Sequence, residues 1–227
     1  MLKNDVEAPP APGLPPGSPV PYALQRVGTT HPQRAAIETT IRRRYWRAHR
    51  ATRCHFLEHL LLVGDACGPL RAALGIGEGR RGRFFLEAYL DEPVDGALSA
   101  RAGVPVARAD TVEIGTLVSF HPSAATQLLL LTVAWLGGYG AKWGVFTATE
   151  EVRDRLHALG LSLLDLGGAD PARLGDAARE WGRYYRARPR VVAASFEDAR
   201  RLIPFVEAAH AAAAHADGAR ARIEGIH

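Results

Sequence analysis

Residues 111–120 alternate between two kinds of side chain, which predicts a β-strand whose successive residues point to opposite faces. One face carries Val112, Ile114, Thr116, Val118 and Phe120, and the other carries Glu113, Gly115, Leu117 and Ser119. The first face is mostly apolar and predicts burial, whereas Glu113 stands in the middle of the second. A carboxylate is expensive to bury unless it is paired or opens into a cleft. Glu113 is therefore the first candidate site residue.

An apolar run over residues 124–136 follows this strand and predicts a helix. Its first N–H groups point back at the end of the strand and favour negative charge there. A second strand is predicted over residues 142–149. Thr147 and Glu150 form a capping-box pattern, which predicts a helix from Glu150 to Gly160. This order of elements is typical of a parallel strand pair with a crossover helix, and such pairs form polar clefts.

The first half of the chain predicts a helix and a hairpin. Residues 34–53 repeat apolar side chains at helical spacing, and four arginines lie largely outside that stripe: Arg42, Arg43, Arg47 and Arg50. This basic face is typical of a solvated helix, and it also suits an acidic partner such as a carrier protein. Residues 54–63 and 70–77 predict two strands paired as a hairpin.

Two further segments gather acidic and aromatic groups. Residues 84–93 form either a helix or a strand, and both place acidic side chains and a tyrosine together: Glu87, Tyr89 and Asp91. Pro93 either ends this element or begins a second helix capped by Asp91. The second segment holds Trp181, Tyr184 and Tyr185 and precedes a last strand predicted over residues 191–196. These aromatic groups suit either a substrate contact or packing under a loop.

Length and composition predict one substantial domain. The chain has 227 residues, of which 47% are hydrophobic and 23% charged, with a net charge of +4. We expect a disordered proline-rich tail over residues 1–30, a single domain over 31–217 that ends in an alanine-rich helix, and a disordered tail over 218–227. The N-terminus lacks the pattern of a secretory signal, and the longest apolar run is too short to span a bilayer. These features favour a soluble, cytoplasmic protein, and the small charge disfavours nucleic acid as a partner.

One short motif suggests a metal site. His55-x-x-Glu58-His59 has the order of the inverted zinc-protease motif, in which both histidines bind Zn²⁺ from one helix face. The strand predicted here would separate these side chains. We therefore favour a protein without a metal site.

Several segments together resemble the thermostable haemolysin family, which is related to GNAT-type acyltransferases and acyl-homoserine-lactone synthases. The matching segments are Phe85-Leu-Glu-Ala-Tyr-Leu-Asp91, Val112-Glu-Ile-Gly-Thr-Leu117, Phe146-Thr-Ala-Thr149 and Trp181-Gly-Arg-Tyr-Tyr185. The resemblance implies a GNAT-like α/β (α+β) fold: a mixed, mostly antiparallel sheet with a splayed parallel strand pair and flanking helices. A thioester donor would enter the splay between residues 111–120 and 142–149, and an amine would enter from the opposite side.

The chain departs from the GNAT pattern at two places. The glycine-rich loop that cradles the CoA pyrophosphate is replaced by Phe120-His-Pro-Ser-Ala-Ala-Thr, which favours the phosphopantetheine thioester of an acyl carrier protein over acyl-CoA as co-substrate. Leu156 stands where many relatives carry the tyrosine that protonates the leaving thiolate. Within the family itself, Thr116 stands where asparagine is expected. The resemblance implies no tightly bound cofactor.

These inferences predict an N-acyltransferase for a small-molecule amine in specialised metabolite biosynthesis. Glu113 would remove the ammonium proton, directly or through water, and backbone N–H groups near residues 117–119 would stabilise the oxyanion. Tyr184, Tyr185 or solvent would protonate the thiolate. The predicted donor contacts are Leu117, Ser119, His121, Ser123, Thr147 and Thr149, with Ser123 and the helix start at the donor phosphate. The predicted acceptor contacts are Glu87, Tyr89, Asp91, Trp143 and Trp181, with Glu87 and Asp91 recognising a cationic group.

Two alternatives belong to other classes of protein. The family's name suggests a membrane-active cytolysin, which the missing transmembrane stretch disfavours. A non-catalytic domain that binds a carrier protein is the second alternative, and it predicts binding without product.

Overall fold

The computed structural model describes residues 23–64, 69–138, 140–201 and 204. The tail predicted over residues 218–227, most of the predicted alanine-rich helix and the first 22 residues lie outside this part of the chain. Residues 196–201 are helical, as expected for the start of the alanine-rich helix.

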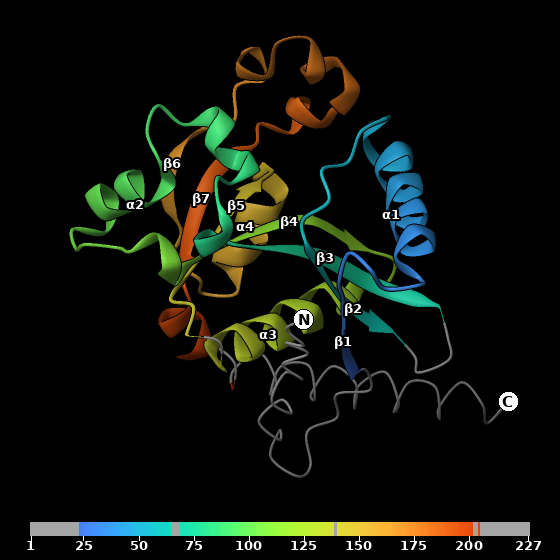
Figure 1. Ribbon diagram of the computed structural model, residues 1–227, viewed down its shortest axis with the longest axis horizontal. Helices are drawn as coiled ribbons and strands as arrows, with labels where there is room; N and C mark the ends of the chain where they lie inside the picture. Colours follow the sequence, from blue (N-terminus) through green and yellow to red (C-terminus); the bar gives the residue numbers. More distant parts are fainter. Residues whose placement is uncertain (1–22, 65–68, 139, 202–203, 205–227) are drawn as a thin grey trace, which may run out of the picture.

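Within the described residues, seven strands form one mixed sheet in the order β1-β2-β3-β4-β5-β7-β6 (Figure 1). They are β1 (Ala23–Val27), β2 (His59–Gly64), β3 (Leu70–Glu78), β4 (Thr111–Ser119), β5 (Trp143–Ala148), β6 (Leu164–Gly168) and β7 (Arg190–Ser195). Neighbouring strands are antiparallel except for β4 and β5, which run parallel. The predicted fold class is confirmed.

The helices of the described part are α1 (Arg34–His49), α2 (Val94–Ala102), α3 (Pro122–Gly138) and α4 (Glu150–Ala158). Short 3₁₀ segments are η1 (Gly79–Arg81), η2 (Phe85–Tyr89), η3 (Arg108–Asp110), η4 (Pro171–Trp181) and η5 (Tyr184–Ala187). The α4 helix begins at Glu150 as predicted, but its N-cap is Thr149, whose hydroxyl accepts the Val152 N–H. Thr147 lies within β5 instead.

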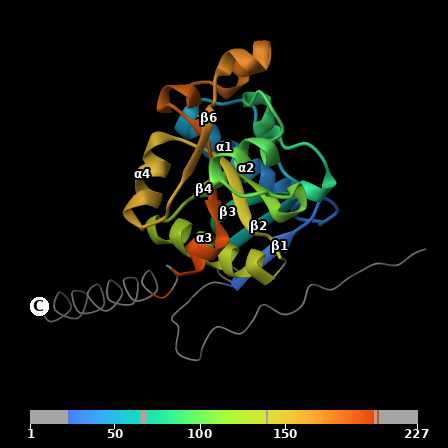
Figure 2. The same cartoon turned by 90° about the vertical axis from the view of Figure 1, so that its left-hand side faces the viewer.

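The helices cover both faces of the sheet. Ile41 of α1 lies in one buried cluster with Leu60, and Leu128 of α3 lies in another with Leu61. Because adjacent residues of a strand point to opposite faces, α1 and α3 cover opposite faces of the sheet (Figure 1). In the turned view of Figure 2, α2 and α4 likewise lie on opposite sides of the sheet. A third buried cluster joins η2 and α2 to β5 and β7.

The paired strands β4 and β5 separate halfway along their length. Their pairing runs from Thr111 opposite Trp143 to Ile114 opposite Phe146, although β4 continues to Ser119 and β5 to Ala148. The far half of β4 therefore has an edge that β5 does not cover. This separation is the splay that the family resemblance implied.

A β-bulge sits in β4 where the splay begins. Ala73 pairs with Val118 and Gly75 pairs with Gly115, so two residues of β4 lie opposite one residue of β3. One of the two, Thr116, has a φ of 53°, which is rare for a β-branched residue. Its hydroxyl donates a 2.7 Å hydrogen bond to the His55 carbonyl and helps to hold this conformation. Asparagine, the residue expected here in the family, adopts this region more readily.

The bulge corrects the predicted alternation of β4. Leu117 packs in the cluster beneath α3, together with Ile114, whereas Val118 packs in the cluster beneath α1. The prediction that Ile114 and Val118 share a face was therefore wrong, because the extra residue inverts the sides of all positions that follow it.

Other elements also differ from prediction. The β1 strand lies inside the predicted tail over residues 1–30, because its pairing with β2 holds a segment whose own pattern is short. The β2 strand begins at His59, because Arg34 of α1 binds the carbonyls of Leu57 and Glu58 and holds them off the sheet. The segment that begins at Phe84 folds as the 3₁₀ turn η2, and β6 was not predicted.

Candidate functional site

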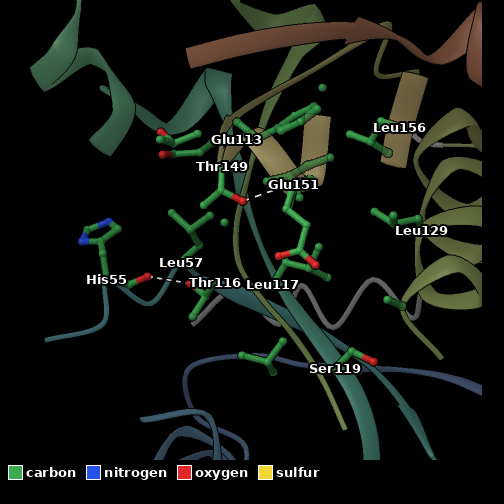
Figure 3. Close-up of a pocket in the computed structure, with 18 of the residues that line it drawn as sticks. His55, Leu57, Glu113, Thr116, Leu117, Ser119, Leu129, Thr149, Glu151 and Leu156 are labelled. Carbon is green, nitrogen blue, oxygen red and sulfur yellow. Dashed lines mark hydrogen bonds between the residues drawn. The ribbon is translucent and has the colours of Figure 1, made fainter. Parts of the chain in front are cut away.

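A cavity of about 420 Å³ opens at the splay between β4 and β5 (Figure 3). Its walls come from both faces of the sheet: Tyr45 of α1 contributes on one side and Leu129 of α3 on the other. Since α1 and α3 cover opposite faces, the cavity passes through the sheet. A ligand entering from the α3 side can therefore meet one entering from the α1 side at the bulge.

Glu113 lies in the wall of this cavity on the α1 side and is 5% exposed. Its two carboxylate oxygens accept the backbone N–H groups of Phe85 (2.9 Å) and Leu86 (3.1 Å) in η2. Burial raises the pKa of this carboxyl to about 7, although these two hydrogen bonds oppose the shift. Glu113 is thus held in place, faces a cavity and exchanges a proton near neutral pH.

Glu87 has the opposite environment and does not line the cavity. Its Oε1 accepts hydrogen bonds from Arg108 and the Val94 N–H, and its Oε2 accepts them from Arg108 and the Phe84 N–H, all within 2.8 Å. Burial would raise its pKa, but these hydrogen bonds outweigh burial and lower the pKa to about 2. Both oxygens are engaged within the fold, and Glu87 borders a separate recess with Asp91 and Arg108, so its predicted acceptor contact is not at this cavity. Glu87, and not Asp91, meets the first N–H of α2.

An aromatic wall borders the cavity beside Glu113. Phe85 stacks on His55 with ring centroids 4.4 Å apart, and Trp181 follows at 5.7 Å from Phe85 and 5.5 Å from Tyr184. Tyr89 also lines the cavity, and its hydroxyl is hydrogen-bonded to that of Tyr185 at 2.8 Å. The rings of Phe85, His55, Trp181, Tyr184 and Tyr89 form a surface that we call the aromatic wall.

The two candidate acids differ in position. Tyr184 lines the cavity, and its hydroxyl donates to the Thr147 carbonyl at 3.4 Å. Burial raises the pKa of Tyr184, so it retains its proton at neutral pH. Tyr185 does not line the cavity but contacts two residues that do: Tyr89 through its hydroxyl, and Tyr184 through its ring at a centroid distance of 5.5 Å.

Some of the residues predicted to contact the donor line the cavity, and others do not. Leu117, Ser119, Thr147 and Thr149 all line the cavity. His121 lies beyond it, where its carbonyl accepts the Ser119 hydroxyl at 2.6 Å. The side chain of Ser123 lies outside the described residues, although its backbone belongs to α3.

The residues predicted to contact the acceptor also lie partly at the cavity and partly elsewhere. Tyr89 and Trp181 line the cavity, whereas Trp143 packs in the cluster beneath α2 and η2. Asp91 is exposed and forms an ion pair with Arg173 away from the cavity. The register of β5 turns Trp143 away, and Asp91 follows the 3₁₀ turn η2 at a position outside the cavity.

Sequence reasoning missed several cavity residues. His55 and Leu57 reach the cavity from the segment before β2, and Glu151 reaches it from the start of α4 (Figure 3). The histidine was noticed only as part of a zinc motif. Residues 55–59 form no helix, so the paired geometry of that motif is not present; His55 stacks on Phe85, and His59 lies in β2. No pattern in the sequence marks Leu57 or Glu151, because their place depends on how distant segments pack.

Solved structures share this mixed α/β fold. The chain resembles TofI in an apo form, with a TM-score of 0.57, 11% identity and coverage of 81% of this chain and 95% of the other. It also resembles BjaI, a CoA-dependent acyl-homoserine lactone synthase solved with SAM and isopentyl-CoA, with a TM-score of 0.54, 12% identity and coverage of 81% and 87%.

The model of the thermostable hemolysin family matches residues 27–200, and the chain belongs to that family. A search of curated proteins found no match. None of the helices in the described part of the chain combines the length and apolar character that a membrane crossing requires.

Proposed function

We propose that this protein is an N-acyltransferase that moves an acyl group from the thioester of a carrier protein or CoA to the amine of a small molecule. The observation that carries this proposal is the cavity that crosses the sheet at the splay, with Glu113 in its wall. Such a cavity lets a thioester at the open end of β4 and an amine beside Glu113 approach one point. It also keeps a carboxylate with a pKa of about 7 beside that point.

The open edge of β4 supplies hydrogen-bond donors for the acyl carbonyl. The Phe120 N–H donates a 2.8 Å hydrogen bond to the Arg71 carbonyl of β3 and therefore points to the β3 edge of the strand. Because backbone N–H groups alternate between the two edges of a strand, those of Ser119 and Leu117 point to the edge that β5 leaves uncovered. These groups are the candidate oxyanion donors.

The reaction then proceeds by ordinary aminolysis. Glu113 accepts a proton from the ammonium group, and the neutral amine attacks the thioester carbon. The tetrahedral oxyanion is stabilised by the β4 N–H groups, and its nitrogen releases a second proton to solvent. As the intermediate collapses the C–S bond breaks, and the thiolate takes a proton from solvent or from Tyr184, which solvent then reprotonates. The products are an amide and a free thiol.

The outer face of α1 supports a carrier protein as donor. Arg42, Arg43, Arg47 and Arg50 are all exposed on this helix. Arg44, which follows Arg43 on the same helix, lines the cavity and donates to the Ser119 carbonyl at 3.1 Å. The basic face therefore borders the cavity at Ser119, the last residue of β4 and away from Glu113. An acidic partner docked there would bring its thioester to the open end of β4.

Thiol release and amide formation test the proposal together. Purified protein is mixed with an acyl-CoA or an acyl carrier protein and a panel of amines, and free thiol and amide are measured by absorbance and mass spectrometry. We expect both products with at least one donor. Binding of the carrier without thiol release would favour a non-catalytic domain, and lysis of erythrocytes without thiol release would favour the cytolysin.

A matched pair of charge reversals tests the donor. Arg43→Glu combined with Arg47→Glu should lower the rate with the carrier protein while the rate with acyl-CoA stays unchanged. Arg101→Glu, on the exposed end of α2, is the control and should change neither rate. Equal rates with the carrier protein in the double variant and in wild type would contradict docking at α1.

A further inference from the structure

We propose that the acceptor is a primary amine that carries a planar aromatic body and has no carboxylate beside its nitrogen. This inference rests on the proposed function and adds the chemical class of the amine. It follows from two separate properties of the cavity on the α1 side: the shape of its wall and the placement of its charges.

The shape of the wall favours a flat, apolar group. His55, Phe85, Trp181 and Tyr184 follow one another with centroid separations between 4.4 and 5.7 Å. Phe85 also belongs to the segment whose N–H group holds Glu113 at 2.9 Å. A ligand whose nitrogen contacts Glu113 therefore lies against these rings, where an aromatic body gains more than an aliphatic chain of similar size.

The placement of charges disfavours an amino acid. Among the described residues that line the cavity, the arginines are Arg44 and Arg155. Arg44 is engaged at the Ser119 carbonyl, and Arg155 pairs with Glu151 at 2.6 Å on α4. Ser119 is the last residue of β4, so Arg44 is held away from Glu113, and Arg155 is held by its own carboxylate partner.

The other basic groups near Glu113 do not provide a cation for a carboxylate. Arg108 is held by Glu87 and Asp95 and does not line the cavity. Burial lowers the pKa of His55, and a nearby arginine, Arg53, lowers it further, so the ring is neutral at neutral pH. Burial likewise lowers the pKa of His49. The carboxylate of an α-amino acid would stand beside Glu113 without a partner of opposite charge.

Matched acceptors test both properties on the wild-type protein. With an acyl-CoA donor, kcat/KM is compared for tyramine and tyrosine, which differ by one carboxylate, and for tyramine and hexylamine, which differ by the ring. We expect tyramine to exceed hexylamine by roughly tenfold, the value of one good aromatic contact. We expect tyrosine to fall below tyramine by a factor of about 100 or more, because its carboxylate is left unpaired.

A pair of tryptophan variants assigns the preference to the wall. Trp181→Leu should remove most of the advantage of tyramine over hexylamine, and Trp181→Phe, which keeps a ring, should retain it. Trp46→Leu is the matched control, since Trp46 is 47% exposed on α1 and does not line the cavity. It should leave the ratio unchanged.

The outcomes separate the inference from the function on which it rests. Tyrosine used as well as tyramine, or hexylamine used as well as tyramine, overturns the acceptor class and leaves the acyltransferase intact. Absence of both thiol release and amide with every amine overturns the function itself.

Discussion

Glu87 within η2 and Glu113 on β4 are two buried carboxylates that bind the same short segment, and they show how little the residue type alone decides. Each accepts backbone N–H groups from this short segment: Glu87 from Phe84, and Glu113 from Phe85 and Leu86. Glu87 also binds Arg108 through both oxygens, whereas Glu113 has no ion pair within the described residues and opens into the cavity. Their pKa values consequently move in opposite directions, to about 2 and about 7.

The difference in pKa indicates different roles: Glu87 stabilises the fold, whereas Glu113 has the properties of a general base. A bidentate guanidinium stabilises the ionised carboxylate at all ordinary pH values, and no free lone pair faces a ligand. Burial without a cation leaves a group that exchanges a proton near neutral pH beside a cavity, as a general base requires. Glu87 nevertheless serves the site, since it fixes the segment that holds Glu113.

We expect the largest effect in the variant Glu113→Gln, on the rate of acyl transfer. The variant keeps the size of the side chain but cannot accept a proton, so acyl transfer should fall by a factor of about 10² to 10⁴. Thermal unfolding and the initial rate are measured on the same preparation, with Glu151→Gln as a control that also lines the cavity. Unchanged transfer in Glu113→Gln would remove Glu113 from the mechanism.

We expect the second largest effect in the variant Glu87→Gln, on the stability of the folded protein. The amide presents a donor to groups that already donate and leaves Arg108 without its buried partner, so the free energy of unfolding should fall by about 3 to 5 kcal/mol. Urea unfolding measures it, and Glu92→Gln, at a neighbouring exposed position, should change it by less than about 0.5 kcal/mol. A loss as small as that of the control would show that Glu87 is not a structural anchor.

The two carboxylates should also respond oppositely to pH. Between pH 4.5 and about 7 the unfolded chain has released the Glu113 proton and the folded chain has kept it, so this group lowers stability as pH rises. Glu113→Gln should therefore gain up to about 3 kcal/mol relative to wild type between pH 4 and pH 8. Glu87 remains ionised in the folded protein down to about pH 2, so its contribution is lost as pH falls below its ordinary value of 4.5.

Urea unfolding of wild type and both variants at a series of pH values separates the two contributions. The rate of acyl transfer should rise with pH and level off above about 7, where Glu113 is ionised. A constant stability difference between Glu113→Gln and wild type across this range would show that the two environments do not differ as described.

The smallest effect is expected in Asp95→Asn. Asp95 is the second carboxylate at Arg108, at 3.2 Å, and its side chain is 34% exposed. Water screens such a pair, so the loss should be under about 1 kcal/mol, well below that of Glu87→Gln. Equal losses in the two variants, measured by urea unfolding, would mean that the buried hydrogen bonds of Glu87 are not the source of its effect.

Much of the framework could be predicted from local pattern. The alternation around Glu113 placed it on a strand, the apolar run predicted α3, and the start of α4 followed from a capping pattern. The strand that pairs at the sheet edge as β1 was missed, because a pairing partner and not its own sequence defines it. The site was predicted only in part, since Leu117, Thr147 and Trp181 reach the cavity while Trp143 and Asp91 do not.

The amino-acid sequence by itself determined the family and most of the order of the elements, because periodicity and local motifs are properties of neighbouring residues. Only the tertiary structure decided which carboxylate faces the cavity. That choice depends on Arg108, which reaches Glu87 from a distant segment, and on the separation of β4 from β5, which opens the cavity beside Glu113. Burial and ion pairing arise between segments far apart in the chain, so the pKa values and roles of these two glutamates could not be read from local pattern.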